Sequence, residues 1–375
     1  MVEPKVEFYR HGLGEEEIAA CQQVLRSLFL TTGPACARFE QAFAAYLGLA
    51  HAVAVSNCTM ALELALMALD IGPGHEVITT PLTFISTPNA VLYAGATPVF
   101  VDVDPVTGNL DPERIAAAVT PRTKAVMPVH LYGTMCDMPA IRKVADAHGL
   151  KVIADCAHAV EATRDGLNSA GLADLACYSF YATKNLACGE GGALACADPA
   201  LAERLKVLRL HGMSKGAAER YHGHYQHWDM VELGKKANLS DILASLLISQ
   251  LPRLAANLAR REEICQRYEQ AFAAIPGVDH PRVPAGAVSA RHLFTIWAKR
   301  RDEFLAGLQK RGIGVAVNYR AVHLLTYYAQ RFGFKPGDFP AAESIGARTL
   351  SLPLYPSLTD AEVDRVIAAV AETAA

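Results

Sequence analysis

Residues 51–79, HAVAVSNCTMALELALMALDIGPGHEVIT, contain one complete repeat of strand, helix and strand. The run His51–Val55 predicts a strand, and the apolar run Thr59–Leu69, which is followed by Gly72, predicts a buried helix. Glu76–Thr79 is the next short strand. Because this alternation is typical of β-α-β units, the stretch predicts an α/β fold: a large domain with a mostly parallel central sheet flanked by helices.

The alternation continues to about Ala197. It predicts further strands at Pro98–Val103, Lys124–His130 and Lys151–Ala154. Between them it predicts helices at Asp111–Val119 and Asp137–His148. In open sheets of this kind, ligands bind where the strands end and the helices begin. We therefore expect the functional residues at these junctions.

The pattern changes after Ala197. The sequence then predicts a helix at Leu201–Leu210, a polar loop at Gly212–Lys236 and a long helical stretch at Leu239–Ala274, which is interrupted at Pro252. A compact α+β unit follows. That unit has predicted strands near Leu293–Ala298 and Gly314–Val317, a helix near Asp302–Arg311 and a final helix from Thr359. We expect a large domain over residues 12–250 and a smaller C-terminal α+β domain over residues 251–375.

Charge and composition exclude several classes of partner. The chain has 35 Lys and Arg against 38 Asp and Glu, interspersed along its length, and a net charge of -3. This balance argues against binding to nucleic acid or to an anionic membrane surface. No apolar run is expected to cross a bilayer, and Met1–Arg10 lacks the apolar core of a secretory signal. We expect a cytoplasmic protein.

The cysteines and histidines do not predict a metal site. The nine cysteines form no CxxC pair and lie mostly in apolar segments, which favours reduced, structural thiols. The densest histidine group, His222, His224 and His227, has no metal-ligand spacing and fits a polar surface loop better.

A lysine near a glycine-rich stretch is the first candidate for chemistry. Lys184 follows the apolar run Leu175–Tyr178 and precedes Gly189-Glu190-Gly191-Gly192. One interpretation is an ordinary loop lysine beside flexible glycines. The other is a Schiff-base lysine, whose amine must be partly desolvated to be neutral and nucleophilic.

Two further junctions carry polar side chains. Asp155 closes the strand Lys151–Ala154, where it either caps a turn or pairs with a cationic ring nitrogen. The turn Ser56–Thr59 joins a strand to a buried helix, so its residues either cap that helix or form a phosphate site at its N-terminus. A phosphate site, an acid for a ring nitrogen and an imine-forming lysine together are the groups that pyridoxal 5'-phosphate (PLP) requires.

The chain resembles the DegT/StrS-type nucleotide-sugar aminotransferases, which have the type I fold of PLP-dependent enzymes. The resemblance runs from about Gly12 to Val370. It rests on several ordered motifs: Leu30-Thr31-Thr32-Gly33-Pro34, Asp155-Cys156-Ala157-His158, Ser179 through Asn185 with Gly189–Gly192, Asn238-Leu239-Ser240-Asp241 and Leu352-Pro353-Leu354-Tyr355-Pro356.

This resemblance implies a role for each matching residue. Lys184 would form the covalent imine with PLP, and Asp155 would pair with the pyridine nitrogen. Phe84 would stack on the ring and His158 would lie near the ring's 3-oxygen. The phosphate would be held by the residues that match the family's phosphate site, namely Cys58 through its amide, Thr59 and Ser179. Asn238 would reach the phosphate of the neighbouring subunit, which implies a homodimer with shared active sites.

The resemblance also implies substrate contacts. Asn185, Tyr319 and His323 match positions that meet the substrate, and the stretch Asn318–His323 is closest to relatives acting on UDP-linked 4-keto sugars. The alternative for Tyr319 and His323 is an ordinary packing role. Glu161 stands where the family commonly has glycine, and the sequence offers no physical account of this charge.

The implied reaction is a transamination. The amino group would pass from L-glutamate to PLP, giving pyridoxamine phosphate, and then to the ketone of a nucleotide-linked keto sugar. The alternatives are a PLP-dependent sugar dehydratase of the same fold and a non-catalytic sensor or partner protein. The comparable dehydratases have histidine in place of the lysine, so Lys184 argues against them.

Overall fold

The computed structural model describes residues 4–214 and 227–374 of the chain. A seven-stranded sheet runs in the order β1-β9-β8-β5-β4-β2-β3. The strands are β1 (His51–Val55), β2 (Glu76–Thr79), β3 (Thr97–Phe100), β4 (Thr123–Met127), β5 (Lys151–Asp155), β8 (Leu175–Ser179) and β9 (Gly192–Cys196). Only β9 is antiparallel to its neighbours in this sheet, so the expected mostly parallel arrangement is confirmed.

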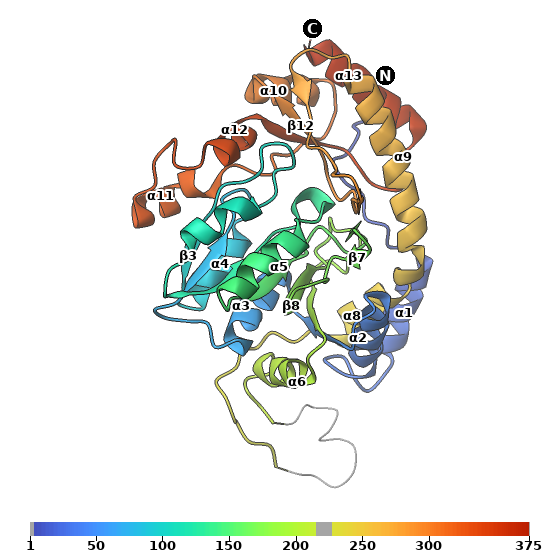
Figure 1. Ribbon diagram of the computed structural model, residues 1–375. Coiled ribbons are helices and arrows are strands. Elements are labelled where there is room, and N and C mark those ends of the chain that lie inside the picture. The colour runs from blue at the N-terminus through green and yellow to red at the C-terminus, as the bar shows by residue number, and fades with distance from the viewer. Residues whose placement is uncertain (1–3, 215–226, 375) are drawn as a thin grey trace.

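Helices cover both faces of the sheet (Figure 1). One face packs on α3 (Cys58–Ala68), α4 (Ser86–Tyr93) and α6 (Pro199–Leu208), and the other on α2 (Pro34–Tyr46), α5 (Met138–Ala147) and α8 (Asp241–Ile248). Alternate strand residues face opposite cores, as Val152 and Ile153 do in β5. This period of two explains why these strands are apolar throughout.

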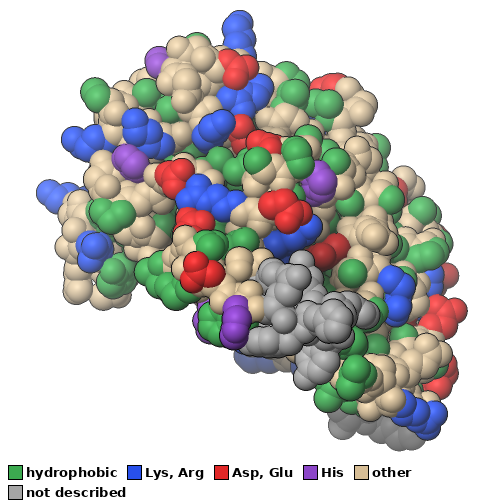
Figure 2. Space-filling view, turned by 90° about the horizontal axis from the view of Figure 1, so that it is seen from below, with side chains coloured by type: hydrophobic (Ala, Val, Ile, Leu, Met, Phe, Trp, Pro, Cys, Tyr) green, Lys and Arg blue, Asp and Glu red, His purple; other side chains and the backbone are tan. Residues whose placement is uncertain are grey.

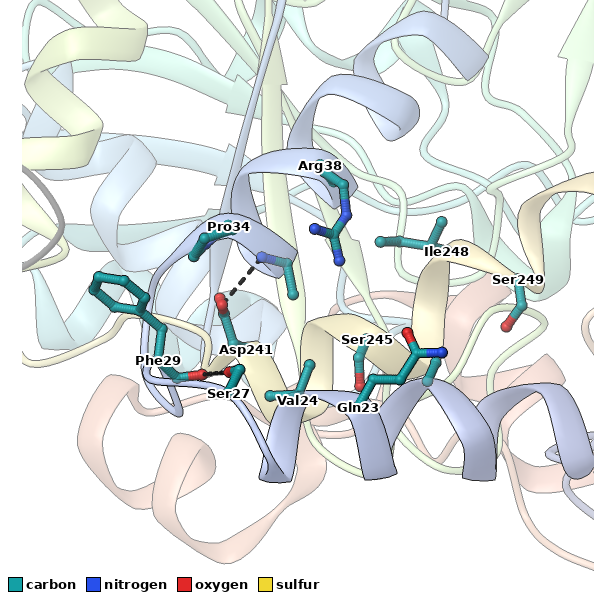
Figure 3. Close-up of a pocket in the computed structure, with 12 residues that line it drawn as sticks. Gln23, Val24, Ser27, Phe29, Pro34, Arg38, Asp241, Ser245, Ile248 and Ser249 are labelled. Atoms are coloured by element: carbon teal, nitrogen blue, oxygen red, sulfur yellow. Dashed lines mark hydrogen bonds between the residues drawn. The ribbon is translucent and has the colours of Figure 1, made fainter.

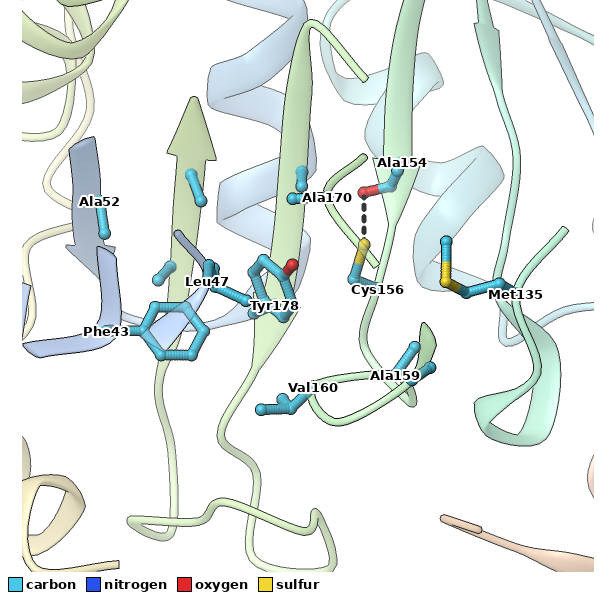
Figure 4. Packing of buried hydrophobic residues seen from close by; sticks show 14 of the residues in the cluster. Phe43, Leu47, Ala52, Met135, Ala154, Cys156, Ala159, Val160, Ala170 and Tyr178 are labelled. Atoms are coloured by element: carbon cyan, nitrogen blue, oxygen red, sulfur yellow. Dashed lines mark hydrogen bonds between the residues drawn. The ribbon is translucent and has the colours of Figure 1, made fainter. Parts of the chain in front are cut away.

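The core on the α2 side combines aromatic and small side chains (Figure 4). Phe43 makes edge contacts with Tyr178 and Phe180, at centroid distances of 5.0 and 5.4 Å. Ala154 and Ala176 on the neighbouring strands leave room for these rings. Large and small residues therefore interlock between the sheet and α2.

The C-terminal region has its own core and a smaller sheet. The order of its strands is β10 (Val278–Asp279), β12 (Phe294–Ala298) and β13 (Thr349–Leu352), and its helices are α10 (Arg301–Lys310), α11 (Thr326–Phe332), α12 (Pro340–Arg348) and α13 (Asp360–Ala374). Its core joins Val6 to residues between Ile264 and Val370. This separate core supports the proposed division near residue 250.

The remaining elements connect these regions. The long helix α9 (Leu254–Phe272) runs from the vicinity of α8 to the C-terminal region (Figure 1), and α1 (Glu15–Leu25) packs on α8. A third small sheet contains β6 (Thr163–Arg164), β7 (Leu167–Asn168) and β11 (Ala287–Val288). It pairs residues of the large region with residues that follow α9, and so braces the two regions.

Two expected elements are different in the structure. The predicted helix Asp111–Val119 is two short 3-10 turns, Pro112–Arg114 and Ala116–Ala118, and Pro121 disfavours helical geometry in the residue before it. The predicted strand at residues 314–317 forms only isolated bridges. Ile313 pairs with Val6 and Ala316 with Ser351, so no continuous ladder develops.

One stretch meets the length and composition criterion for a membrane span. It is Asp241–Phe272, with a mean hydropathy of 1.3 in its most apolar window. The 3-10 turn Leu251–Arg253 divides it into α8 and α9, and the core helices of globular proteins pass the same test. On the face shown in Figure 2, acidic and basic side chains are interspersed.

The polar loop predicted at Gly212–Lys236 is only partly described. His222 and His224 lie outside the described residues, and the position of His227 begins the second described range. All nine cysteines are free and eight are buried. Among residues 4–214 and 227–374, no group of three or more His, Cys, Asp or Glu side chains suits a metal ion.

Candidate active site

A cavity of about 760 Å³ opens at the carboxyl ends of the parallel strands. We call it the Lys184 cavity. It is lined by eight of the residues predicted from the sequence: Cys58, Thr59, Phe84, Asp155, His158, Ser179, Lys184 and Tyr319. Residues from β5, β8, the start of α3 and the C-terminal region meet here, as the rule for open α/β sheets predicts.

Lys184 lies in the turn after β8. Its backbone N–H donates to the carbonyl of Tyr181 at 2.8 Å, which holds the turn closed. Burial lowers the pKa of Lys184 to about 8, although Cys58 and Asp155 act in the opposite direction. A substantial fraction of the amine is therefore neutral near pH 8, as a nucleophile requires.

Asp155 ends β5 and is almost fully buried. Its Oδ2 accepts a hydrogen bond from Thr87 Oγ1 at 2.8 Å, and its Oδ1 accepts one from the amide of Ala157 at 3.1 Å. Burial raises the pKa of Asp155, while these two donors and Lys184 lower it. A buried carboxylate beside a cavity favours a cationic group in that cavity, which is the property a pyridinium nitrogen needs.

The start of α3 has the features of an anion site. Asn57 caps this helix by accepting from the amide of Met60 at 2.9 Å, so the preceding amides remain available to a ligand. A Cβ on Gly192 would lie 2.8 Å from the nitrogen of Cys58 and 2.6 Å from the carbonyl carbon of Asn57. Only glycine allows β9 to approach the helix terminus this closely. With Thr59 and Ser179 on the cavity wall, the site fits a phosphate.

His158 and two aromatic rings form another wall. The Nδ1 of His158 accepts a hydrogen bond from the amide of Tyr132 at 3.2 Å, and its Nε2 lies 3.2 Å from the hydroxyl of Tyr319. The rings of Phe84 and Tyr319 are 5.8 Å apart. Phe84 is 53% exposed in the single chain, so its face is accessible to a planar ligand.

Three predicted site residues lie elsewhere. Asn185 donates both amide hydrogens within the protein, to Glu161 Oε2 at 2.9 Å and to the carbonyl of Ala290 at 2.8 Å. His323 is fully buried, and its Nε2 lies 3.0 Å from Glu343. This geometry does not support direct substrate contacts for Asn185 or His323, because these groups are engaged away from the Lys184 cavity.

Asn238 lines a separate cavity of about 580 Å³. Its side-chain amide donates to Thr31 Oγ1 at 3.1 Å and to Thr32 Oγ1 at 2.7 Å. The Thr31-Thr32-Gly33-Pro34 motif and the Asn238 motif therefore meet in space although they are about 200 residues apart. The predicted reach of Asn238 to a neighbouring subunit stays a prediction.

Sequence reasoning missed Thr87, Tyr132 and His292. Thr87 contacts Asp155 across 68 residues, and His292 contacts Lys184 across 108 residues. No local motif links residues at such separations, since the contacts depend on how strands and loops are packed.

The chain belongs to the DegT/DnrJ/EryC1/StrS aminotransferase family, whose sequence pattern matches residues 12–371. It is a PLP-dependent aminotransferase of fold type I. The chain is 48% identical to the spore coat polysaccharide biosynthesis protein SpsC of Bacillus subtilis, over 99% of this chain and 98% of that protein.

Two solved structures show the same fold. One is Spr1654 of Streptococcus pneumoniae in its PLP form, assigned as a sugar aminotransferase, with 30% identity, a TM-score of 0.91 and coverage of 99% of this chain and 98% of the other. The other is DesI in the presence of its TDP-sugar product, with 31% identity, a TM-score of 0.89 and coverage of 99% and 93%. The resemblance seen in the sequence is thereby confirmed.

Proposed function

We propose that this enzyme transfers the amino group of L-glutamate to the ketone of a nucleotide-linked 4-keto sugar, with UDP as the expected nucleotide. The products are a nucleotide-linked amino sugar and 2-oxoglutarate. The observation that carries the proposal is the Lys184 cavity, which combines an amine of lowered pKa with the buried carboxylate of Asp155. The TDP-sugar product of DesI supports a nucleotide sugar as the acceptor.

The residues of the cavity have complementary roles in this proposal. PLP, when bound, supplies an electron sink for negative charge that develops at the substrate Cα. Asp155 would keep the ring nitrogen protonated, and Phe84 would stack on the ring. Thr59, Ser179 and the amide of Cys58 would hold the phosphate at the positive end of α3.

Lys184 is the acid and base of both half-reactions in this proposal. Its amine takes the proton from the Cα of glutamate and later returns a proton to the carbon that was the sugar ketone. Tyr319 lines the cavity, which supports its proposed contact with the sugar. The proposal needs no metal ion.

The deciding experiment is an absorption measurement on the purified protein. L-glutamate should remove the visible band of the lysine-bound cofactor, and one member of a panel of UDP- and dTDP-linked keto sugars should restore it. Restoration by a dTDP sugar alone would overturn the choice of nucleotide.

The other outcomes separate the alternatives. A colourless protein is first reconstituted with PLP. If the absorption band of the reconstituted protein does not change with any amino donor, the proposed reaction is wrong. The protein would then be assigned as a non-catalytic sensor or partner protein. Loss of a sugar hydroxyl without amino transfer would indicate a dehydratase.

A further inference from the structure

His292 contacts Lys184, and no sequence motif predicted it. Its Nε2 is 3.4 Å from the Nζ of Lys184, and the residue is 5% exposed. Its ring centroid is 4.5 Å from that of His158. The effect of His292 on Lys184 depends on which ring nitrogen carries the proton. A protonated Nε2 would donate a hydrogen bond to the lysine amine, and an unprotonated Nε2 would accept one from it.

The orientation of the Asn185 side chain determines which nitrogen of His292 is protonated. One side of its amide faces the carboxylate of Glu161 at 2.9 Å and the carbonyl of Ala290 at 2.8 Å. Both of these groups only accept hydrogen bonds, so the NH₂ of Asn185 must face them. The carbonyl Oδ1 of Asn185 therefore faces the other way, toward His292.

The tautomer of His292 follows from this orientation. Its Nδ1 lies 3.2 Å from Asn185 Oδ1, which can only accept, so Nδ1 carries the proton. Burial lowers the pKa of His292 well below its ordinary value, and the positive charge of Lys184, the neighbouring His158 and Arg261 lower it further. The ring is thus neutral, and the lone pair of Nε2 points at the lysine amine.

His158 provides an internal contrast. The backbone amide of Tyr132 can only donate, so Nδ1 of His158 must accept and its proton lies on Nε2, facing Tyr319. The two neighbouring histidines therefore have opposite tautomers. The tautomer of His292 follows from Asn185 Oδ1, which can only accept a hydrogen bond. The tautomer of His158 follows from the amide of Tyr132, which can only donate one.

A buried ion pair anchors the far end of the network. Arg261 and Glu161 form a salt bridge in which both side chains are nearly inaccessible, and the second oxygen of Glu161 accepts from Asn185. Arg261 also donates to the carbonyl of Ala290 at 3.3 Å. This arrangement supplies the physical account of Glu161 that the sequence lacked: its charge is paired and fixes the orientation of Asn185.

We propose that His292 is a positioning residue for Lys184, which holds the free lysine amine through the lone pair of Nε2 in a tautomer imposed by Asn185. Lys184 is a free amine whenever it is not bonded to the cofactor, and an unheld lysine has several accessible rotamers. An acceptor at a fixed place keeps the amine near the reacting atoms. The inference rests on the proposed role of Lys184 as the reactive amine.

The first test measures the tautomer directly. In the cofactor-free, full-length protein labelled with ¹⁵N-histidine, nitrogen chemical shifts distinguish protonated from unprotonated ring nitrogens. We expect His292 to be protonated on Nδ1 and His158 on Nε2. The signals of His292 are assigned by their loss in His292→Gln. A proton on Nε2 of His292, or a doubly protonated ring near neutral pH, overturns the proposal.

The second test measures the effect on Lys184. The rate at which the cofactor-free protein takes up PLP is followed by absorbance against pH, and its midpoint reports the pKa of the lysine. The groups that face this amine are Cys58, Asp155, His158 and His292. His292→Phe should lower the midpoint by roughly half to one pH unit, because an ammonium loses more than an amine when its acceptor is removed.

A conservative variant separates positioning from packing. His292→Gln can place an amide oxygen near the position of Nε2, so it should keep the midpoint close to that of the wild type. An unchanged midpoint in His292→Phe, or an equal shift in both variants, overturns the proposal. Neither test uses an amino donor or a sugar, so failure here is distinguishable from failure of the proposed reaction.

Discussion

Lys184 and Asp155 illustrate how burial, as the largest cause, shifts the pKa values of ordinary side chains. Desolvation lowers the pKa of the amine and raises that of the carboxyl group, so each shift disfavours the charged form. A ligand with a cationic ring nitrogen suits this site, because that nitrogen can pair with the Asp155 carboxylate, which burial leaves poorly solvated. The predictions at this scale concern these two residues.

We expect Lys184→Ala to abolish multiple turnover with glutamate and keto sugar, because no other amine lines the described cavity. Steady-state assays check this, and bound pyridoxamine phosphate in the purified variant would show that the site remains intact. Lys310→Ala, at an exposed position, is the matched control and should retain activity. Sustained turnover by Lys184→Ala contradicts the assignment.

We expect Asp155→Asn to keep bound cofactor but lose activity by about 10²-fold or more, since a neutral amide cannot hold the ring nitrogen protonated. The measurement compares cofactor content with kcat. Asp198→Asn makes the same change at the N-cap of α6, away from the cavity, and should leave kcat unaltered. Near-normal kcat in Asp155→Asn is the opposing result.

The lowered pKa of Lys184 also predicts a pH effect on stability. In the cofactor-free protein, the folded state loses this proton near pH 8 and the unfolded chain near 10.5. Between these values the unfolded state binds more protons, so the contribution of Lys184 to the free energy of unfolding rises with pH. Below pH 8 its contribution stays constant.

Urea unfolding of the cofactor-free wild type and of Lys184→Met, compared at pH 7 to 10, isolates this contribution. The stability of the wild type relative to the variant should increase above about pH 8. A difference that is flat across this range, or that falls, would show that the lysine has an ordinary pKa.

Among the elements, α2 and α8 are joined by Asp241, which belongs to the family motif Asn238–Asp241. Asp241 starts α8 and is 2% exposed, and its carboxylate accepts from the amides of Gly33, Ala35 and Cys36 at 2.7, 3.0 and 2.9 Å. Figure 3 shows one of these hydrogen bonds to Asp241. These amides begin α2 and would otherwise lack partners. One carboxylate therefore caps a helix that lies about 200 residues earlier in the chain.

We expect Asp241→Ala to reduce the free energy of unfolding by roughly 2 to 4 kcal/mol, because three buried donors lose a charged acceptor. Chemical denaturation measures this change. Asp198→Ala removes the more exposed cap of α6 and should cost about 1 kcal/mol. Equal losses in the two variants would mean that burial adds nothing to the Asp241 interaction.

For the whole molecule, we propose that a second subunit shares the active site at the edge of the Lys184 cavity. Phe84, Ile85, Tyr93 and Tyr181 are exposed in the single chain, at 38% to 60%. Three of these four side chains line the cavity. A second subunit that covers this rim would bury them and would bring its own Asn238 to the phosphate, as proposed for a homodimer.

Subunit mixing tests this arrangement. Lys184→Ala and Asn238→Ala variants should each be impaired when pure, and mixed subunits should recover about one quarter of the wild-type sites, because half of the dimers are hybrids with one intact site. Assays after co-refolding measure the recovery. No recovery in a mixture that contains hybrid dimers would place Asn238 outside the neighbouring site.

The sequence by itself determined the layered α/β fold and eight of the residues that line the Lys184 cavity. Hydrophobic periodicity and turn signals are local, so the sequence alone predicts the strands and the helix within residues 51–79. Asp155, Ser179 and Lys184 follow strands, and parallel strands bring their carboxyl ends to one edge of a sheet. Their proximity therefore follows from the order of elements alone.

Only the tertiary structure decided the surroundings of these residues. It placed His292 against Lys184, gave Asn185 an internal partner in Glu161, and buried His323 away from the cavity. These contacts join residues that are 24 to 108 positions apart, or depend on which side chains a loop excludes from solvent. Packing between separate elements sets such contacts, and no local pattern in the chain encodes that packing.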